Sequence, residues 1–169
     1  MPSLIFFIWG DRMQKFSAFF DSIINPARYQ DVDSILVVMH ANVEFANFLT
    51  ALGSVSRIAA VIPKASSKKF ADLSTLRRNF PVIDIDRQEI LANPNQFMGL
   101  VGRVTRNERF AIIDMGGYFS HIAIDLVKKF DKQIVGIVED TENGHQKYET
   151  LIAKKKLTEN LTPIISVAR

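Results

Sequence analysis

The sequence predicts one α/β domain built on a doubly wound, mostly parallel sheet. Short apolar runs rich in β-branched residues alternate with segments whose apolar residues recur at helical spacing. The runs have the length of buried parallel strands, which read as continuous hydrophobic stretches. Neither an internal repeat nor a Pro/Gly/Ser-rich linker divides the 169 residues, so we expect a single domain over 1–169.

The first part of the chain supplies a lead-in and two strands. Residues 1–33 are an apolar and helical lead-in, in which several Phe and Ile side chains share one helical face. Residues 34–39 form a buried strand, and the amphipathic helix that follows is closed by Gly53. Residues 58–62 form the next strand, which Pro63 ends.

Shorter elements are expected before residue 105. In order, they are a loop at 64–69, a helix at about 69–79, a strand at 82–84, a partly helical segment at 88–97 and a further helical turn within 98–104. Asn93-Pro94-Asn95 should break the helical segment, because proline disfavours helix in the residue before it.

The alternation is clearest from residue 110 onward. Residues 110–113 form a strand ending at Asp114, Gly116-Gly117 makes a turn, and a helix follows to Phe130. The next strand, 134–138, ends in Glu139-Asp140. A further helix passes through Tyr148 to Ile152, and 162–167 reads as a final strand. Two successive strand ends thus bring carboxylates and glycines to the carboxyl edge of a parallel sheet, where ligands bind in such folds.

Composition narrows the function classes. A hydrophobic content of 47% and a charged content of 23% are typical of a globular protein. The net charge is +3, and the basic residues have no interleaved aromatics, so they predict solvated helix faces and no nucleic-acid partner. The absence of cysteine excludes disulfides and thiolate chemistry. No apolar stretch approaches the roughly 18 residues of a membrane span, so we expect a cytoplasmic protein with no membrane partner.

Several common motifs are missing. The sequence has no G-x-G-x-x-G, no P-loop and no G-x-S-x-G elbow, which argues against a dinucleotide fingerprint, a phosphate loop or a hydrolase triad in this chain. The three histidines lack metal-ligand spacing, so no metal is expected.

Two strand ends carry features with more than one interpretation. His40 directly follows a strand, which is suggestive but not specific. The Glu139-Asp140 pair can be an acidic helix start, with Asp140, Thr141 or Asn143 as the N-cap. It can also supply a carboxylate that accepts hydrogen bonds from the vicinal hydroxyls of a ribose. Position alone favours the cap.

Three sequence blocks resemble the substrate-binding domain of the S-adenosylhomocysteine hydrolase family. Residues 39–44 (MHANVE) resemble its L-H-x-T-x-E block, and the helix that follows ends like its L-x-x-L-G. Residues 112–118 (IIDMGGY) resemble I-L-D-D-G-G/A-D, and residues 136–146 (GIVEDTENGHQ) resemble G-x-x-E-E-T-T-T-G-V-H. The order and spacing of the blocks agree over about 34–167, which is the family-like core.

The resemblance implies a Rossmann-like fold and an adenosine site formed by the three blocks. His40, Asp140 and Thr141 retain the family's residue type, whereas Asn42 and Met115 replace a threonine and the active-site aspartate. The candidate substrate-binding residues are therefore His40, Asn42, Glu44, Asp114, Met115, Asp140, Thr141, Glu142 and Asn143.

The family's catalytic parts have no counterpart here. Its reaction needs NAD together with a lysine and an aspartate from an N-D-S-V-T-K-S-K-F-D segment, whereas this sequence ends at the corresponding strand, 163–169. Met115 cannot take or give a proton. We therefore expect no catalytic residue in this chain, and we expect it to be the N-terminal part of a longer NAD-dependent, adenosylhomocysteinase-like hydrolase of one-carbon metabolism. NAD is expected only if a C-terminal domain follows.

The expected function is binding of an adenosine-type nucleoside against His40, Asn42, Met115 and Asp140, with Asp140 accepting hydrogen bonds from the ribose hydroxyls. One alternative is a free-standing, non-catalytic regulatory or interaction module with the same fold. Another is an enzyme of different specificity, with a pocket remodelled by Met115 and Glu142. A homo-oligomer is left open.

Overall fold

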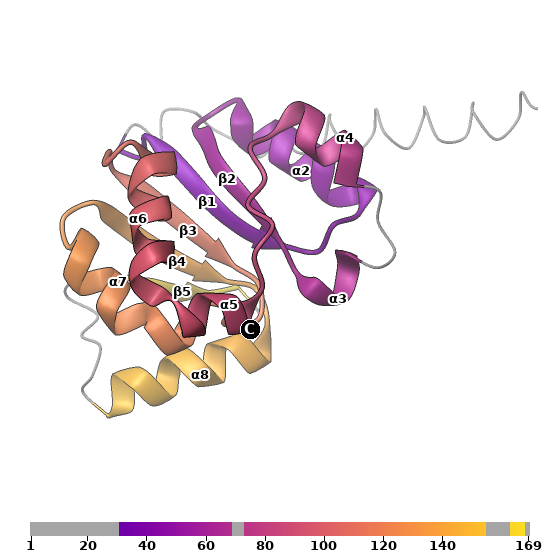
Figure 1. Ribbon diagram of the computed structural model, residues 1–169. Coiled ribbons are helices and arrows are strands. Elements are labelled where there is room, and N and C mark those ends of the chain that lie inside the picture. The colour runs from indigo at the N-terminus through magenta and orange to yellow at the C-terminus, as the bar shows by residue number, and fades with distance from the viewer. Residues whose placement is uncertain (1–30, 69–72, 155–162, 168–169) are drawn as a thin grey trace, which may run out of the picture.

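A five-stranded, all-parallel sheet organises the computed structural model, which describes residues 31–68, 73–154 and 163–167 (Figure 1). The strands are β1 (Ser34–Met39), β2 (Arg57–Pro63), β3 (Phe110–Asp114), β4 (Ile134–Glu139) and β5 (Ile164–Ser166). Their order across the sheet is β2-β1-β3-β4-β5. The predicted doubly wound, Rossmann-like α/β fold is confirmed, and every strand pair in this sheet is parallel.

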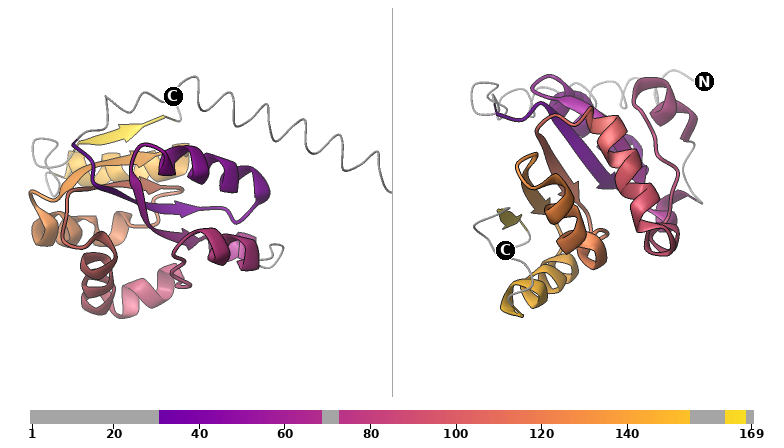
Figure 2. Two further views of the ribbon diagram at one scale, coloured as in Figure 1. Left: turned by 90° about the horizontal axis from the view of Figure 1, so that it is seen from above. Right: turned by 60° about the vertical axis from the view of Figure 1, so that its left-hand side comes forward.

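Helices cover both faces of the sheet (Figures 1 and 2). One face carries α2 (Val43–Gly53) and α4 (Leu73–Asn79), and the other carries α5 (Arg87–Ala92), α6 (Pro94–Thr105), α7 (Ala123–Phe130) and α8 (Glu142–Ala153). The short helix α3 (Ala65–Lys68) follows β2, and a 3-10 turn, η2 (Ser120–Ile122), precedes α7. Because parallel crossovers are right-handed, the reversal of strand order after β2 places α2 opposite α6, α7 and α8.

The central strand β1 divides the hydrophobic core into two clusters. All six of its residues are buried, and its side chains alternate between the faces. Leu36 and Val38 pack toward α6, α7 and α8, together with the buried rings of Phe97, Phe110, Phe119 and Tyr148. Ile35, Val37 and Met39 pack toward α2 and α4. Since β1 lies between two other strands, its carboxyl end is held in a fixed position beside that of β3.

Two predicted elements differ in the structure. The segment predicted as a strand at 82–84 forms only one bridge, between Val61 and Val82. The Ile83 amide still donates to the Val61 carbonyl at 2.9 Å, and Asp84 beyond it forms salt bridges of 2.6 Å with both Lys68 and Arg77. The predicted loop at 64–69 contains α3, whose first turn is closed by the bond from the Ser67 amide to the Lys64 carbonyl.

The predicted break at Asn93-Pro94-Asn95 is confirmed, since α5 ends at Ala92 and α6 begins at Pro94. Pro94 occupies the start of α6, where its missing N–H costs nothing. Beyond it, α6 is one continuous helix rather than the separate turn predicted for 98–104. The lead-in predicted for 1–33 lies almost entirely outside the described residues, as does the start of the helix predicted at 69–79. Among the helices that the structure describes, none is long and apolar enough to cross a membrane.

Candidate functional site

The candidate site lies at the carboxyl edge of the sheet, where the strand order reverses. β1 and β3 are neighbours, but their following segments lead to helices on opposite faces (Figure 1). In open α/β sheets the crevice at such a switch point is the usual place for a ligand. The loops after β1, β2, β3 and β4 supply the side chains at this edge.

Asp114, the last residue of β3, serves the turn that follows it. Its Oδ1 accepts a hydrogen bond from the Tyr118 amide at 2.8 Å, and its Oδ2 accepts from the Phe119 amide at 2.9 Å and the Tyr148 hydroxyl at 2.6 Å. The residue has no exposed surface, and burial raises the pKa of its carboxyl to about 6 even though these donors act in the opposite direction. Asp114 thus holds the turn from inside the core.

Glu139, at the end of β4, is the register partner of Asp114 and is equally buried. Its Oε1 accepts from the Gly116 amide at 2.8 Å, the Thr141 amide at 2.8 Å and the Thr141 hydroxyl at 2.7 Å. Its Oε2 accepts from the Gly117 amide at 2.7 Å. The loops after β3 and β4 are therefore joined through one carboxylate, and hydrogen bonds of this charged kind are the stronger ones in proteins.

A different group of side chains surrounds the outside of this edge. Asp140 is half-buried, and its Oδ1 is buried without a hydrogen-bond partner among the described residues. Burial and the neighbouring Glu139 raise the pKa of Asp140, while Lys64, a hydrogen bond from its own backbone amide and His40 act to lower it. The pKa of His40 is lowered by burial and by Lys64, against the opposing effect of Asp140. His40, Lys64 and Asp140, from three different loops, are thus brought within electrostatic reach of one another.

Backbone hydrogen bonds fix the loops that carry these residues. The Lys64 amide donates to the Met39 carbonyl at 2.8 Å, at the end of β1. The Ala41 amide donates to the Ser67 hydroxyl at 2.9 Å, and that hydroxyl donates to the Lys64 carbonyl at 2.7 Å. The loop after β1, with His40, is therefore tied to the loop after β2, with Lys64.

No protein-family model and no curated protein matches the chain. The groups at this edge are a carboxylate oxygen without a hydrogen-bond partner in the described part of the chain, an imidazole and several cations.

Three of the other predicted residues cap helices or pack in the core. Asn42 is exposed and caps α2 by accepting from the Phe45 amide at 3.0 Å. Thr141 is the N-cap of α8 and accepts from the Gly144 amide at 3.0 Å, so it is the cap among the three candidates considered. Met115 is 5% exposed and packs in the cluster beneath α2 and α4.

Three more predicted residues contribute less to a site. Glu142 and Asn143 are exposed in the first turn of α8, where Glu142 accepts from the Gln146 side chain at 3.2 Å. Glu44 lies in α2, but its side chain is outside what the structure describes. Met115 is buried in the core and Glu142 is exposed, and the enzyme of different specificity remains a hypothesis.

Sequence reasoning missed the basic residues at this edge. Lys147 Nζ donates to the Gly116 carbonyl at 2.9 Å, and Arg87 Nη2 donates to the Gly117 carbonyl at 3.0 Å and to the Ser120 hydroxyl at 3.2 Å. Lys64 Nζ lies 3.0 Å from the point that a Cβ on Gly116 would occupy. The position of Lys64 directly after a strand was the signal available for it. Arg87 and Lys147 lie at helix positions that no pattern marked.

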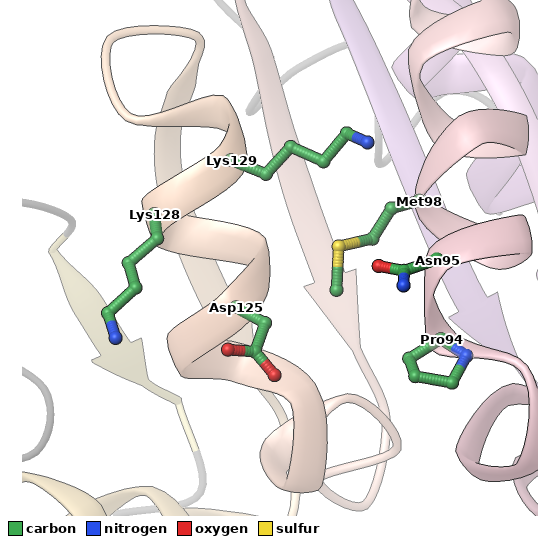
Figure 3. Close-up of a pocket in the computed structure, with 6 residues that line it drawn as sticks. All are labelled: Pro94, Asn95, Met98, Asp125, Lys128 and Lys129. Carbon is green, nitrogen blue, oxygen red and sulfur yellow. The ribbon is translucent and has the colours of Figure 1, made fainter.

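A separate groove lies between α6 and α7 (Figure 3). It has a volume of about 490 Å³ and is lined by Pro94, Asn95, Met98, Asp125, Lys128 and Lys129. Figure 3 shows Lys129 extending toward Met98, whereas Lys128 points away. None of the predicted site residues lines this open groove. Among the described residues, no cluster of three or more His, Asp or Glu side chains is placed to hold a metal ion.

Proposed function

We propose that this chain binds an adenosine-type nucleoside at the carboxyl edge of the sheet, with Asp140 accepting hydrogen bonds from the ribose hydroxyls. The observation that carries the proposal is the buried Oδ1 of Asp140, which has no partner among the described residues. A buried oxygen without a partner costs about 1–3 kcal/mol, and ligand hydroxyls would remove that cost. The resemblance of the three sequence blocks to a family that binds adenosine supports the same ligand class.

His40 supports this assignment through its position and charge state. Its lowered pKa favours the neutral imidazole near pH 7, which offers one donor and one acceptor to a ligand. The loop contacts that tie His40 to the end of β2 hold it in place before any ligand arrives. The proposal covers binding and not catalysis. A role as the substrate-binding part of a larger NAD-dependent hydrolase is a further step of the same proposal.

Isothermal titration calorimetry with adenosine tests the proposal on the wild-type chain and on Asp140→Asn. The amide keeps the size of the carboxylate but not its charge, so adenosine affinity should fall by at least about tenfold. The variant should fold normally, because removing the half-buried charge of Asp140 also removes its repulsion with Glu139, which raises the pKa of Asp140 in the wild type. Asp125→Asn, at an exposed position on α7, is the matched control and should bind like the wild type.

Unchanged affinity in Asp140→Asn would remove Asp140 from the site. If adenosine neither binds nor raises the melting temperature of the wild-type chain, the nucleoside proposal is wrong, and the interaction module becomes the better hypothesis.

A further inference from the structure

Three cationic side chains converge on two consecutive residues, Gly116 and Gly117. Lys147 Nζ and Arg87 Nη2 contact their two carbonyl oxygens at 2.9 and 3.0 Å, and Lys64 Nζ lies beside the Gly116 Cα. The three cations come from the loop after β2, from α5 and from α8, so the fold rather than the local sequence assembles them. Adjacent Cα atoms are only about 3.8 Å apart, which keeps these charges close together.

The charges of this cluster are only partly compensated. Lys64 Nζ makes no hydrogen bond or salt bridge within the part of the chain that the structure describes. Burial, Arg87 and Lys64 all lower the pKa of Lys147, although Glu139 and Asp114 oppose them. Those two carboxylates are fully buried, and their oxygens already accept bonds from the glycine turn, Thr141 and Tyr148.

The glycines leave room for the cations at this turn. Gly116 and Gly117 have φ angles of +90° and +60°, which residues other than glycine rarely adopt. A Cβ at Gly116 would lie 3.0 Å from Lys64 Nζ, and one at Gly117 would lie 3.0 Å from Lys147 Cδ. Both ammonium stems therefore pack directly on the backbone, beside the candidate nucleoside site.

We propose that the ligand of this site carries a phosphate group, so that the preferred ligand is a nucleoside phosphate rather than a free nucleoside. The inference rests on the proposed function, because Asp140 would take the ribose hydroxyls while Lys64, with Lys147 and Arg87, faces the phosphate. A phosphate at neutral pH carries close to two negative charges and three acceptor oxygens, which match several cations better than a single carboxylate does. The charge of Lys64 acts on the pKa of both Asp140 and His40, so the two parts of the ligand would lie within electrostatic range of each other.

A purely structural role explains Lys147 and Arg87 but not Lys64. The first two hold the turn by donating to its carbonyls, and the buried Nε–H of Arg87 has no hydrogen-bond partner among the residues that the structure describes. Lys64 makes no such bond, and its side chain is the one of the three whose removal should leave the turn intact. Lys64→Gln therefore separates phosphate binding from the stability of the fold.

The test is calorimetric titration with adenosine, adenosine 5′-monophosphate and ribose 5-phosphate on the wild type, Lys64→Gln and Lys128→Gln. The monophosphate should bind the wild type at least about tenfold more tightly than adenosine. Lys64→Gln should remove most of this preference while leaving adenosine affinity within about twofold, as expected when one charged contact is lost. Lys128→Gln, an exposed lysine on α7, should behave like the wild type.

The outcomes distinguish this inference from the function on which it rests. If adenosine binds in an Asp140-dependent way but the monophosphate binds no more tightly, the phosphate site is overturned and the nucleoside site stands. An equal preference for the monophosphate in the wild type and Lys64→Gln overturns the role of Lys64. Binding of ribose 5-phosphate without adenosine binding supports the phosphate site and contradicts the nucleoside. If none of the three ligands binds, both proposals are wrong.

Discussion

Replacement of Gly144 by alanine should destabilise the protein, although helix propensity alone predicts the opposite. Gly144 lies in the first turn of α8, where alanine would favour helix by up to about 1 kcal/mol. A Cβ on Gly144 would, however, lie 2.1 Å from Glu139 Cδ and 2.3 Å from each of its carboxylate oxygens. Such contacts cannot persist, so either the carboxylate or the helix must move.

The carboxylate cannot move without loss, because its oxygens accept from Gly116, Gly117 and Thr141. Breaking two hydrogen bonds to a buried charge costs about 3–6 kcal/mol, since each contributes about 1.5–3 kcal/mol. After the gain in helix propensity of about 1 kcal/mol is subtracted, the free energy of unfolding should fall by about 2–5 kcal/mol. For a chain of this size, that corresponds to a drop in melting temperature of about 4–20 °C.

Equilibrium unfolding in urea, monitored by circular dichroism, measures this change. The matched control is Gly99→Ala in α6, where the nearest atom to the new Cβ would be Arg103 Nη1 at an ordinary 3.7 Å. That variant should gain up to about 1 kcal/mol, as helix propensity predicts. A Gly144→Ala protein as stable as the wild type would refute the steric reasoning and the fixed position of Glu139.

Three further predictions concern the buried carboxylates and their hydrogen-bond donors. Asp114 has a pKa of about 6 in the folded chain against an ordinary 3.8, so the folded state holds its proton to higher pH than the unfolded chain does. The free energy of unfolding should therefore fall by about 3 kcal/mol as the pH rises from about 4 to about 6. This pH dependence should vanish in Asp114→Asn. Tyr148→Phe removes a donor to the ionised form, so its cost should be about 1.5–3 kcal/mol at pH 7 and smaller at pH 4; a cost independent of pH would contradict this coupling. Thr141→Ala should cost about 1–2 kcal/mol through loss of the α8 cap and of the bond to Glu139, whereas Thr141→Ser should stay close to the wild type in thermal unfolding; equal losses in both would show that the hydroxyl is not the stabilising group.

The sheet was predictable because its central strands are largely buried. Runs such as 35–39 and 134–138 are continuously apolar and short, and each is followed at once by a polar residue, at or beside which the structure ends the strand. The strand predicted at 82–84 is reduced to one parallel bridge at Val82, because pairing along an outer edge depends on where the chain goes next. Asp84 turns toward Lys68 and Arg77, and no local pattern carries that information.

Within the candidate site, sequence position showed which strand ends meet but not which way their side chains face. Asp114 was predicted to contact a ligand, and in the structure its oxygens accept hydrogen bonds from Tyr118, Phe119 and Tyr148. The alternation of β3 contained a signal for this, since Asp114 has the same parity as the core residue Ile112. The approach of Lys64 to Gly116 depends on tertiary packing, so spacing along the chain could not reveal it.

The shared carboxylate of Glu139 has a mechanical consequence for this edge of the sheet. Gly116 and Gly117 belong to one crossover and Thr141 to the next, yet their amides depend on the same two oxygen atoms. A displacement of either loop must therefore break its hydrogen bonds to Glu139 or move the other loop with it. A molecule that displaces the glycine turn would in this way also displace the start of α8, more than twenty positions further along the chain.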